Sequence, residues 1–212
     1  MDEPFRAGWQ RAWAGIGADG AGVELFDALV ARYSEPHRRY HTLQHLAECL
    51  RAFDAVHTLA QRPHEVAVAL WFHDAIYDTR ASDNEQRSAD WAREALRAAG
   101  VAEDAGGRVH ALILATRHDA APRAGDESLL VDIDLSILGA DATRFDEYEA
   151  QIRAEYAFVP GFLFRRKRRE ILQGFLDRPR IYGTAVFHDR LEAAARANLI
   201  KAIAATRRGP GR

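Results

Sequence analysis

Cysteine, glycine and proline are all scarce in this chain. Its 212 residues include one cysteine, Cys49, with 15 glycines and 7 prolines. A single cysteine excludes an internal disulfide framework and any zinc module built from several cysteines, and it fits a reducing compartment. Because glycine and proline punctuate regular structure, their scarcity favours long uninterrupted helices.

Long apolar runs and a strong net charge are also missing. No run approaches the ~20 residues that a membrane-spanning helix needs. The first ten residues, MDEPFRAGWQ, lack the apolar core of a signal peptide. The formal net charge of -2 argues against a protein that coats nucleic acid. We therefore expect a cytoplasmic protein with neither a membrane nor a nucleic acid as its partner.

Apolar residues recur at helical spacing along most of the chain. Phe5, Trp9 and Trp13 repeat every four residues, so they share one helical face and are expected in the core. Pro63 can open a helix that runs through VAVALWFHDAIY, and Ser82 with Glu85 has the capping-box pattern of a helix start. The periodicity predicts further helices over about 23–33, 37–60, 106–117, 127–138, 142–157, 161–176 and 185–206.

One segment, LLVDIDLSIL, is rich enough in β-branched residues to form a strand. Its neighbours are all helical and no turn dipeptide supplies a partner strand, so we interpret it as a buried helix. The sequence thus predicts one all-α domain over 1–206 and a disordered tail over 207–212. A domain of this size buries roughly 70% of its unfolded surface, and needs no structural metal to fold.

The most distinctive feature is a set of histidines and aspartates. His41 and His45, in YHTLQH, are four residues apart and so would share one helix face, from which two imidazoles could reach one metal ion. By spacing alone, a pair of half-exposed helix histidines is the better interpretation.

His73 and Asp74 lie inside an apolar segment, where an ionised carboxylate costs several kcal/mol unless it is paired or bound to a cation. An internal His–Asp hydrogen bond between helices is the alternative.

Two further aspartates interrupt LLVDIDLSIL. On a helix Asp132 and Asp134 lie about 200° apart, so they cannot both face one ligand. One is expected to be a ligand, and the other a partner of an arginine, a histidine or a helix end. His118 ends the apolar stretch VHALILATRH, from which it could reach the same cavity.

The ordered set H…HD…D resembles the signature of the HD-domain superfamily of metal-dependent phosphohydrolases. The phrases YHTLQH, FHDAIYD, DNEQRSA, ATRHD and DIDLSILG are similar to one bacterial group of predicted HD phosphohydrolases, over nearly the whole chain. YHTLQH and DLS also resemble segments of the cyclic nucleotide phosphodiesterases, which share the HD helical core. The resemblance implies an HD helical bundle with a metal site in its core.

The resemblance also assigns roles to individual residues. It implies four metal ligands: His45, His73, Asp74 and Asp134. In the phosphodiesterases the first histidine of the pair is the proton donor, which makes His41 the general-acid candidate. His41 and Asp74 are accordingly the expected catalytic residues.

Four other residues could assist such a site. Asp78 would follow Asp74 on the same helical face, and it could orient a ligand, bind water or hold a second metal. Glu85 could do the same, although the capping box explains it equally well. His118 is a candidate ligand of a second metal, as dinuclear HD enzymes insert extra histidines before the last aspartate. Arg39 could hold a phosphate or form a surface salt bridge.

We therefore expect hydrolysis of a phosphate ester, for which a nucleotide is one candidate substrate. Imidazole and carboxylate ligands suit Mn, Fe, Ni, Co or Zn, whereas Mg prefers oxygen ligands. Two alternatives remain: a catalytically silent HD module that binds a nucleotide or phosphorylated metabolite, and a di-iron HD oxygenase.

The basic run RRKRR at 165–169 spreads around a helix and is interpreted as solvated surface, with a phosphate-steering rim or an RNA contact as the alternative.

Overall fold

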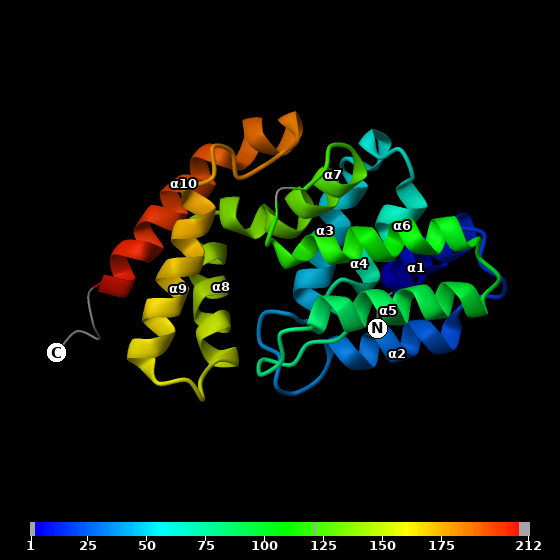
Figure 1. Ribbon diagram of the computed structural model, residues 1–212, viewed down its shortest axis with the longest axis horizontal. Helices are drawn as coiled ribbons and strands as arrows, with labels where there is room; N and C mark the ends of the chain where they lie inside the picture. The colour runs from blue at the N-terminus through cyan, green and yellow to red at the C-terminus, as the bar shows by residue number, and fades with distance from the viewer. Residues whose placement is uncertain (1–2, 121, 208–212) are drawn as a thin grey trace. The chain divides into compact units, whose positions relative to one another are not determined.

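The regular structure of the protein is helical. A computed structural model describes residues 3–120 and 122–207 (Figure 1). Within these ranges the chain forms helices only, and no strand, which confirms the all-α prediction. The α-helices are α1 (Glu3–Gly15), α2 (Val23–Tyr33), α3 (Leu43–Asp54), α4 (Pro63–Phe72), α5 (Asn84–Ala98), α6 (Glu103–Leu114), α7 (Asp126–Asp134), α8 (Ala142–Glu155), α9 (Gly161–Leu176) and α10 (Ala185–Arg207). The short 3-10 helices are η1 (His57–Leu59), η2 (Ala115–Arg117) and η3 (Leu135–Gly139).

The chain divides into two compact units, Met1–Val131 and Asp132–Arg212. Each is described by itself. The single domain expected over 1–206 stays a prediction. Of the expected tail, 208–212 lies outside the described residues, and Arg207 is the last residue of α10.

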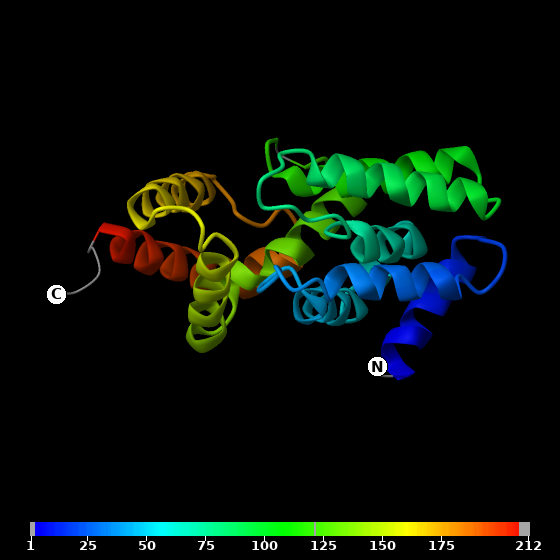
Figure 2. The same ribbon diagram turned by 90° about the horizontal axis from the view of Figure 1, so that it is seen from below.

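Helix α4 is the centre of the first unit. It is apolar around its whole circumference, as expected of a helix with neighbours on every side, and it packs against α1, α3, α5 and α6. Helices α5 and α6 lie side by side in both views (Figures 1 and 2). Because His73 and Asp74 directly follow α4, the burial of this helix brings His73 into the interior of the unit, with Asp74 half-buried next to it.

Aromatic side chains fill the space between α1 and α4. Trp9 stacks on Trp13 with ring centroids 5.0 Å apart and meets Trp71 edge-on at 5.5 Å. Phe5 also meets Trp71 edge-on, at 5.5 Å. Both Trp9 and Trp13 are buried, which confirms them as core residues.

Helix α3 begins later than the periodicity predicts. Thr42 is its N-cap, in an extended conformation, and its hydroxyl accepts a hydrogen bond from the Gln44 amide. The His41 carbonyl accepts a hydrogen bond from the Arg38 guanidinium instead of entering the helix. The expectation that His41 and His45 share one helix face is therefore wrong, since His41 precedes the helix.

Helix α4 ends earlier than expected. In a continued helix the Asp74 amide would donate to the Leu70 carbonyl. The His73 ring occupies that carbonyl, and the Asp74 amide donates to the Tyr33 hydroxyl. Asp74 and Asp78 consequently do not share a helical face, contrary to expectation.

The second unit is organised around α10, which packs against α8, α9 and η3. Its polar residues bind backbone groups of the preceding segments. The Asn198 amide group donates to the Leu138 and Ala140 carbonyls, and Glu192 accepts from the Ile181 and Tyr182 amides. In the part of the chain that the structure describes, no helix combines the length and apolar character that crossing a membrane requires.

Candidate metal centre

His45 projects from the first turn of α3 into the interior of the first unit. Its side chain is 2% exposed. Nδ1 lies 3.0 Å from the Tyr40 hydroxyl, and the two rings are in contact. With Nδ1 occupied by this hydroxyl, Nε2 is the ring nitrogen available for a further partner.

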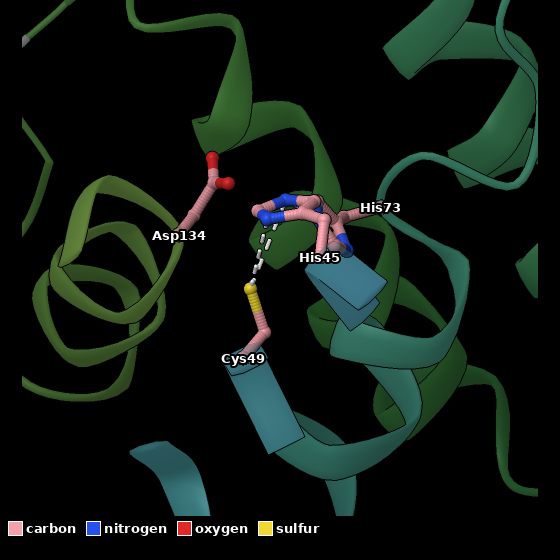
Figure 3. Close-up of side chains that lie close together, drawn as sticks. All are labelled: His45, Cys49, His73 and Asp134. Carbon is pink, nitrogen blue, oxygen red and sulfur yellow. Dashed lines mark hydrogen bonds between the residues drawn. The ribbon is translucent and has the colours of Figure 1, made fainter. Parts of the chain in front are cut away.

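His73 comes from the end of α4 and is equally buried. Its Nδ1 lies 2.7 Å from the Leu70 carbonyl, which can only accept, so Nδ1 carries the proton. When the ring is neutral, its Nε2 atom therefore carries a lone pair and can bind a metal ion. This Nε2 lies 3.2 Å from Nε2 of His45 (Figure 3). A carbonyl on the far ring nitrogen is the usual way in which proteins orient a metal-binding histidine.

Asp74 completes a triangle of potential ligand atoms. Its Oδ2 lies 3.1 Å from Nε2 of His73 and 3.4 Å from Nε2 of His45. Ligand atoms at bond lengths near 2.1 Å are about 3.0 Å apart in octahedral and about 3.4 Å apart in tetrahedral geometry. The three separations in the first unit fall within this range. The donor set of two imidazoles and one carboxylate fits a divalent transition metal.

Electrostatics keep Asp74 in the form that a ligand needs. Burial would raise the pKa of Asp74, but the charges of His73 and His41 in their protonated forms, and the hydrogen bonds that His45 and His73 then donate, outweigh burial and hold it well below its usual range. The carboxylate is therefore ionised at neutral pH. An ionised, half-buried carboxylate beside two imidazoles attracts a cation.

Cys49 lies close to His45 and His73, and the sequence did not identify it as a candidate ligand. One ligand atom of each of His45, Cys49 and His73 lies within 4.8 Å of the others. Cys49 follows His45 by four residues on α3, and this spacing was the available signal. Its Sγ is 3.7 Å from both nitrogens of His45, so it sits beside the ring rather than in line with either lone pair (Figure 3).

His41 lies next to the triangle and outside it. The ring stacks on Tyr77 with centroids 4.0 Å apart and meets the His45 ring edge-on at 6.0 Å. Its charge contributes to the lowered pKa of Asp74. The side chain is half-buried, so it reaches the site from the solvent side.

The two aspartates of α7 belong to the second unit. Asp132 anchors the start of α10, because its carboxylate accepts from the Gly183 amide at 2.8 Å and from the amide and hydroxyl of Thr184 at 2.7 and 2.6 Å. A helix end was one of the partners considered for it from the sequence. Asp134 is the last residue of α7. Its role as a ligand stays a prediction.

The structure places the remaining candidates on loops and helix ends. Asp78 accepts from the Arg80 amide, and its own amide donates to the Asn84 side chain, so it shapes the turn before α5. Glu85 lies in the first turn of α5, whose N-cap Asp83 makes no side-chain capping bond, so the expected capping box with Ser82 is wrong. Their roles at a metal stay predictions.

His118 is the C-cap of η2, which directly follows α6, and it adopts a left-handed conformation with φ 57°. Arg39 is exposed on the loop before α3. Its predicted role in holding a phosphate, and that of His118 as a second-metal ligand, stay predictions.

The basic run lies on α9 and is only partly solvated. Lys167 pairs with Glu170 at 3.6 Å. Arg168 is buried, ion-paired with Glu149 and 4.9 Å from the Tyr148 ring centroid. The fourth residue of the run is thus a structural arginine.

Comparisons with protein-family models, with curated proteins and with solved structures give no match. The residues of this chain and the resemblance of their pattern are therefore the basis for proposing a function.

Proposed function

We propose that the protein is an HD-domain phosphohydrolase that uses a divalent transition metal to cleave a phosphate ester. The observation that carries the proposal is the triangle of His45 Nε2, His73 Nε2 and Asp74 Oδ2, with sides of 3.1–3.4 Å. Neutral imidazoles and a carboxylate at these separations are suited to a metal ion. Asp134 is the fourth ligand in this proposal, on the strength of the H…HD…D order.

A bound cation would polarise the phosphoryl oxygens and lower the pKa of an attacking water. The residues of the chain do the rest. Asp74 is a carboxylate whose Oδ2 oxygen faces both imidazoles. His73 keeps its proton on Nδ1 against the Leu70 carbonyl, so its Nε2 lone pair stays directed at the site.

His41 is the proposed general acid. Its ring stacks on Tyr77 and meets the His45 ring edge-on, which supports a role beside the triangle and outside the ligand set. A protonated imidazole there would give its proton to the departing alkoxide, which contributes typically 10²–10⁴-fold to rate.

The test combines metal analysis with a substrate panel. Protein purified without chelator is assayed for metal, then offered nucleotides, phosphomonoesters and phosphodiesters with added Mn²⁺. Release of phosphate or of a monoester, lost in His73→Ala, supports the proposal. Metal without turnover on any substrate would favour the silent binding module. An oxygen-dependent ultraviolet–visible spectrum of the iron-loaded protein would favour the di-iron oxygenase.

A further inference from the structure

A buried arginine lies beneath the site, and neither the sequence pattern nor the proposed chemistry uses it. The Arg38 side chain is 0% exposed, although its neighbour Arg39 is exposed. A buried guanidinium is costly unless its donors are satisfied. The groups that accept its hydrogen bonds therefore indicate its structural role.

Three of its hydrogen bonds go to backbone carbonyls of the site segments. Nη1 donates to the His41 carbonyl at 3.0 Å and to the Asp74 carbonyl at 2.7 Å. Nη2 donates to the Ala75 carbonyl at 3.0 Å. One nitrogen atom thus joins the backbone of the proposed general acid to that of a proposed metal ligand, across 33 positions of the sequence.

The rest of the environment fixes the guanidinium plane. Nε donates to Glu35 Oε2 at 3.1 Å, which balances the charge. The Tyr33 and Tyr77 ring centroids lie 5.3 and 5.5 Å from the guanidinium carbon. Only a planar fork with several donors can meet these acceptors together, and a lysine ammonium cannot.

We propose that Arg38 is a positioning residue, which sets the separation between the His41 and Asp74 segments and thereby the geometry of the metal site. Its cation also binds the Asp74 and Ala75 carbonyls just beyond the end of α4, close to the negative end of the helix dipole. The link to metal binding and turnover depends on the proposed function. The mechanical link between the two segments does not.

The experiment uses Arg38→Lys, which keeps the charge and loses the fork, and Arg38→Gln, which loses both. Arg32→Lys is the matched control, because Arg32 pairs with the same Glu35 at 3.1 Å but is half exposed to solvent. Hydrogen exchange of the metal-free proteins is measured by mass spectrometry, and cobalt affinity by titration. Should Arg38→Gln fail to fold, Arg38→Lys still provides both measurements.

In Arg38→Lys we expect faster exchange in the two peptides that contain Thr42 and Asp74, and unchanged exchange in α5 and α6. Cobalt affinity should fall by about 10–100-fold, as for other residues that orient ligands, and kcat should fall more than KM rises. Arg32→Lys should match the wild type throughout.

Unchanged exchange in the two peptides would overturn the inference, and so would uniformly faster exchange across the first unit, which would indicate a general loss of stability. Cobalt affinity within about twofold of wild type in Arg38→Lys would overturn the link to the metal. If the wild type binds no cobalt, the proposed function fails, and exchange alone decides whether Arg38 joins the two segments.

Discussion

Asp74 of the first unit and Asp132 of the second are both screened from solvent, but their surroundings shift the two pKa values in opposite directions. Burial raises the pKa of Asp132, and the hydrogen bonds from Thr184 and Gly183 only partly offset it. Burial acts the same way on Asp74, yet the neighbouring imidazoles reverse it and lower the pKa.

The difference lies in the partners. Asp132 binds backbone amides and a hydroxyl, which can only anchor it. Asp74 faces two imidazole nitrogens that are themselves potential ligands. A carboxylate held by backbone donors has a structural role, whereas one that faces imidazoles able to give up a proton and bind a metal is suited to a cation site.

The largest effect is expected from Asp74→Asn. The amide removes the charge that the two imidazoles share, so turnover should fall to the background rate and metal should no longer raise the melting temperature. In the wild type, metal at 100 times its Kd should add about 2.7 kcal/mol to the free energy of unfolding. Thermal melts with and without Mn²⁺ measure this. A full metal-dependent shift in Asp74→Asn would contradict the ligand assignment.

The next effect concerns His41→Ala, which should keep metal and lose about 10²–10⁴-fold in turnover of esters with poor leaving groups. Activated aryl phosphates hardly need a proton on the leaving group, so they should suffer much less. Parallel kcat measurements on both substrate types, with metal content as the control, separate the roles. Loss of the metal would make His41 a ligand instead.

Asp132→Asn should show the opposite pattern to Asp74→Asn. Its amide nitrogen opposes the Gly183 and Thr184 donors, so the free energy of unfolding should drop by about 1–3 kcal/mol, with metal content unchanged. Denaturant unfolding measures the loss of stability, and elemental analysis measures the metal content. Asp134→Asn is the companion variant and should lose metal. Equal metal loss from both variants would refute the choice of Asp134.

The smallest effect is expected at Glu192 of α10. Burial would raise the pKa of Glu192, but the Ile181 and Tyr182 amides and Arg196 outweigh it and lower the pKa. A lowered pKa stabilises the fold above the unfolded value of about 4.3, and this contribution is lost as the pH falls through the folded value. Glu192→Gln should therefore cost about 1 kcal/mol at pH 7.

Denaturant unfolding at a series of pH values tests the sign. The difference in stability between wild type and Glu192→Gln should shrink steadily below pH ~4. A difference that stays constant down to pH ~2 would show that the carboxylate's charge contributes nothing.

Regular helices were predictable because local pattern governs them. The segment 161–176 is α9 with the same bounds, and it begins directly after Pro160. The helix expected from LLVDIDLSIL is α7 continued by η3. In these segments apolar periodicity and turn residues agree, so long-range contacts are not needed to place them.

The start of α3 and the end of α4 could not be predicted, because side chains outside these two helices take backbone groups at their ends. Arg38 takes the His41 carbonyl, and Tyr33 takes the Asp74 amide. The motif predicted that His45, His73 and Asp74 lie in one site. It also predicted His41 on the same helix as His45, but His41 precedes that helix. Cys49 was missed because a single cysteine at helical spacing carries little information by itself.

Metal content tests the central claim most directly. Wild type and His73→Ala, purified without chelator, are loaded with Mn²⁺, Co²⁺ or Zn²⁺, dialysed and measured by inductively coupled plasma mass spectrometry. The account predicts at least one equivalent of one of these metals per wild-type chain and none in His73→Ala, with both proteins folded by circular dichroism. No stoichiometric metal in the wild type, or equal metal in the variant, would contradict it.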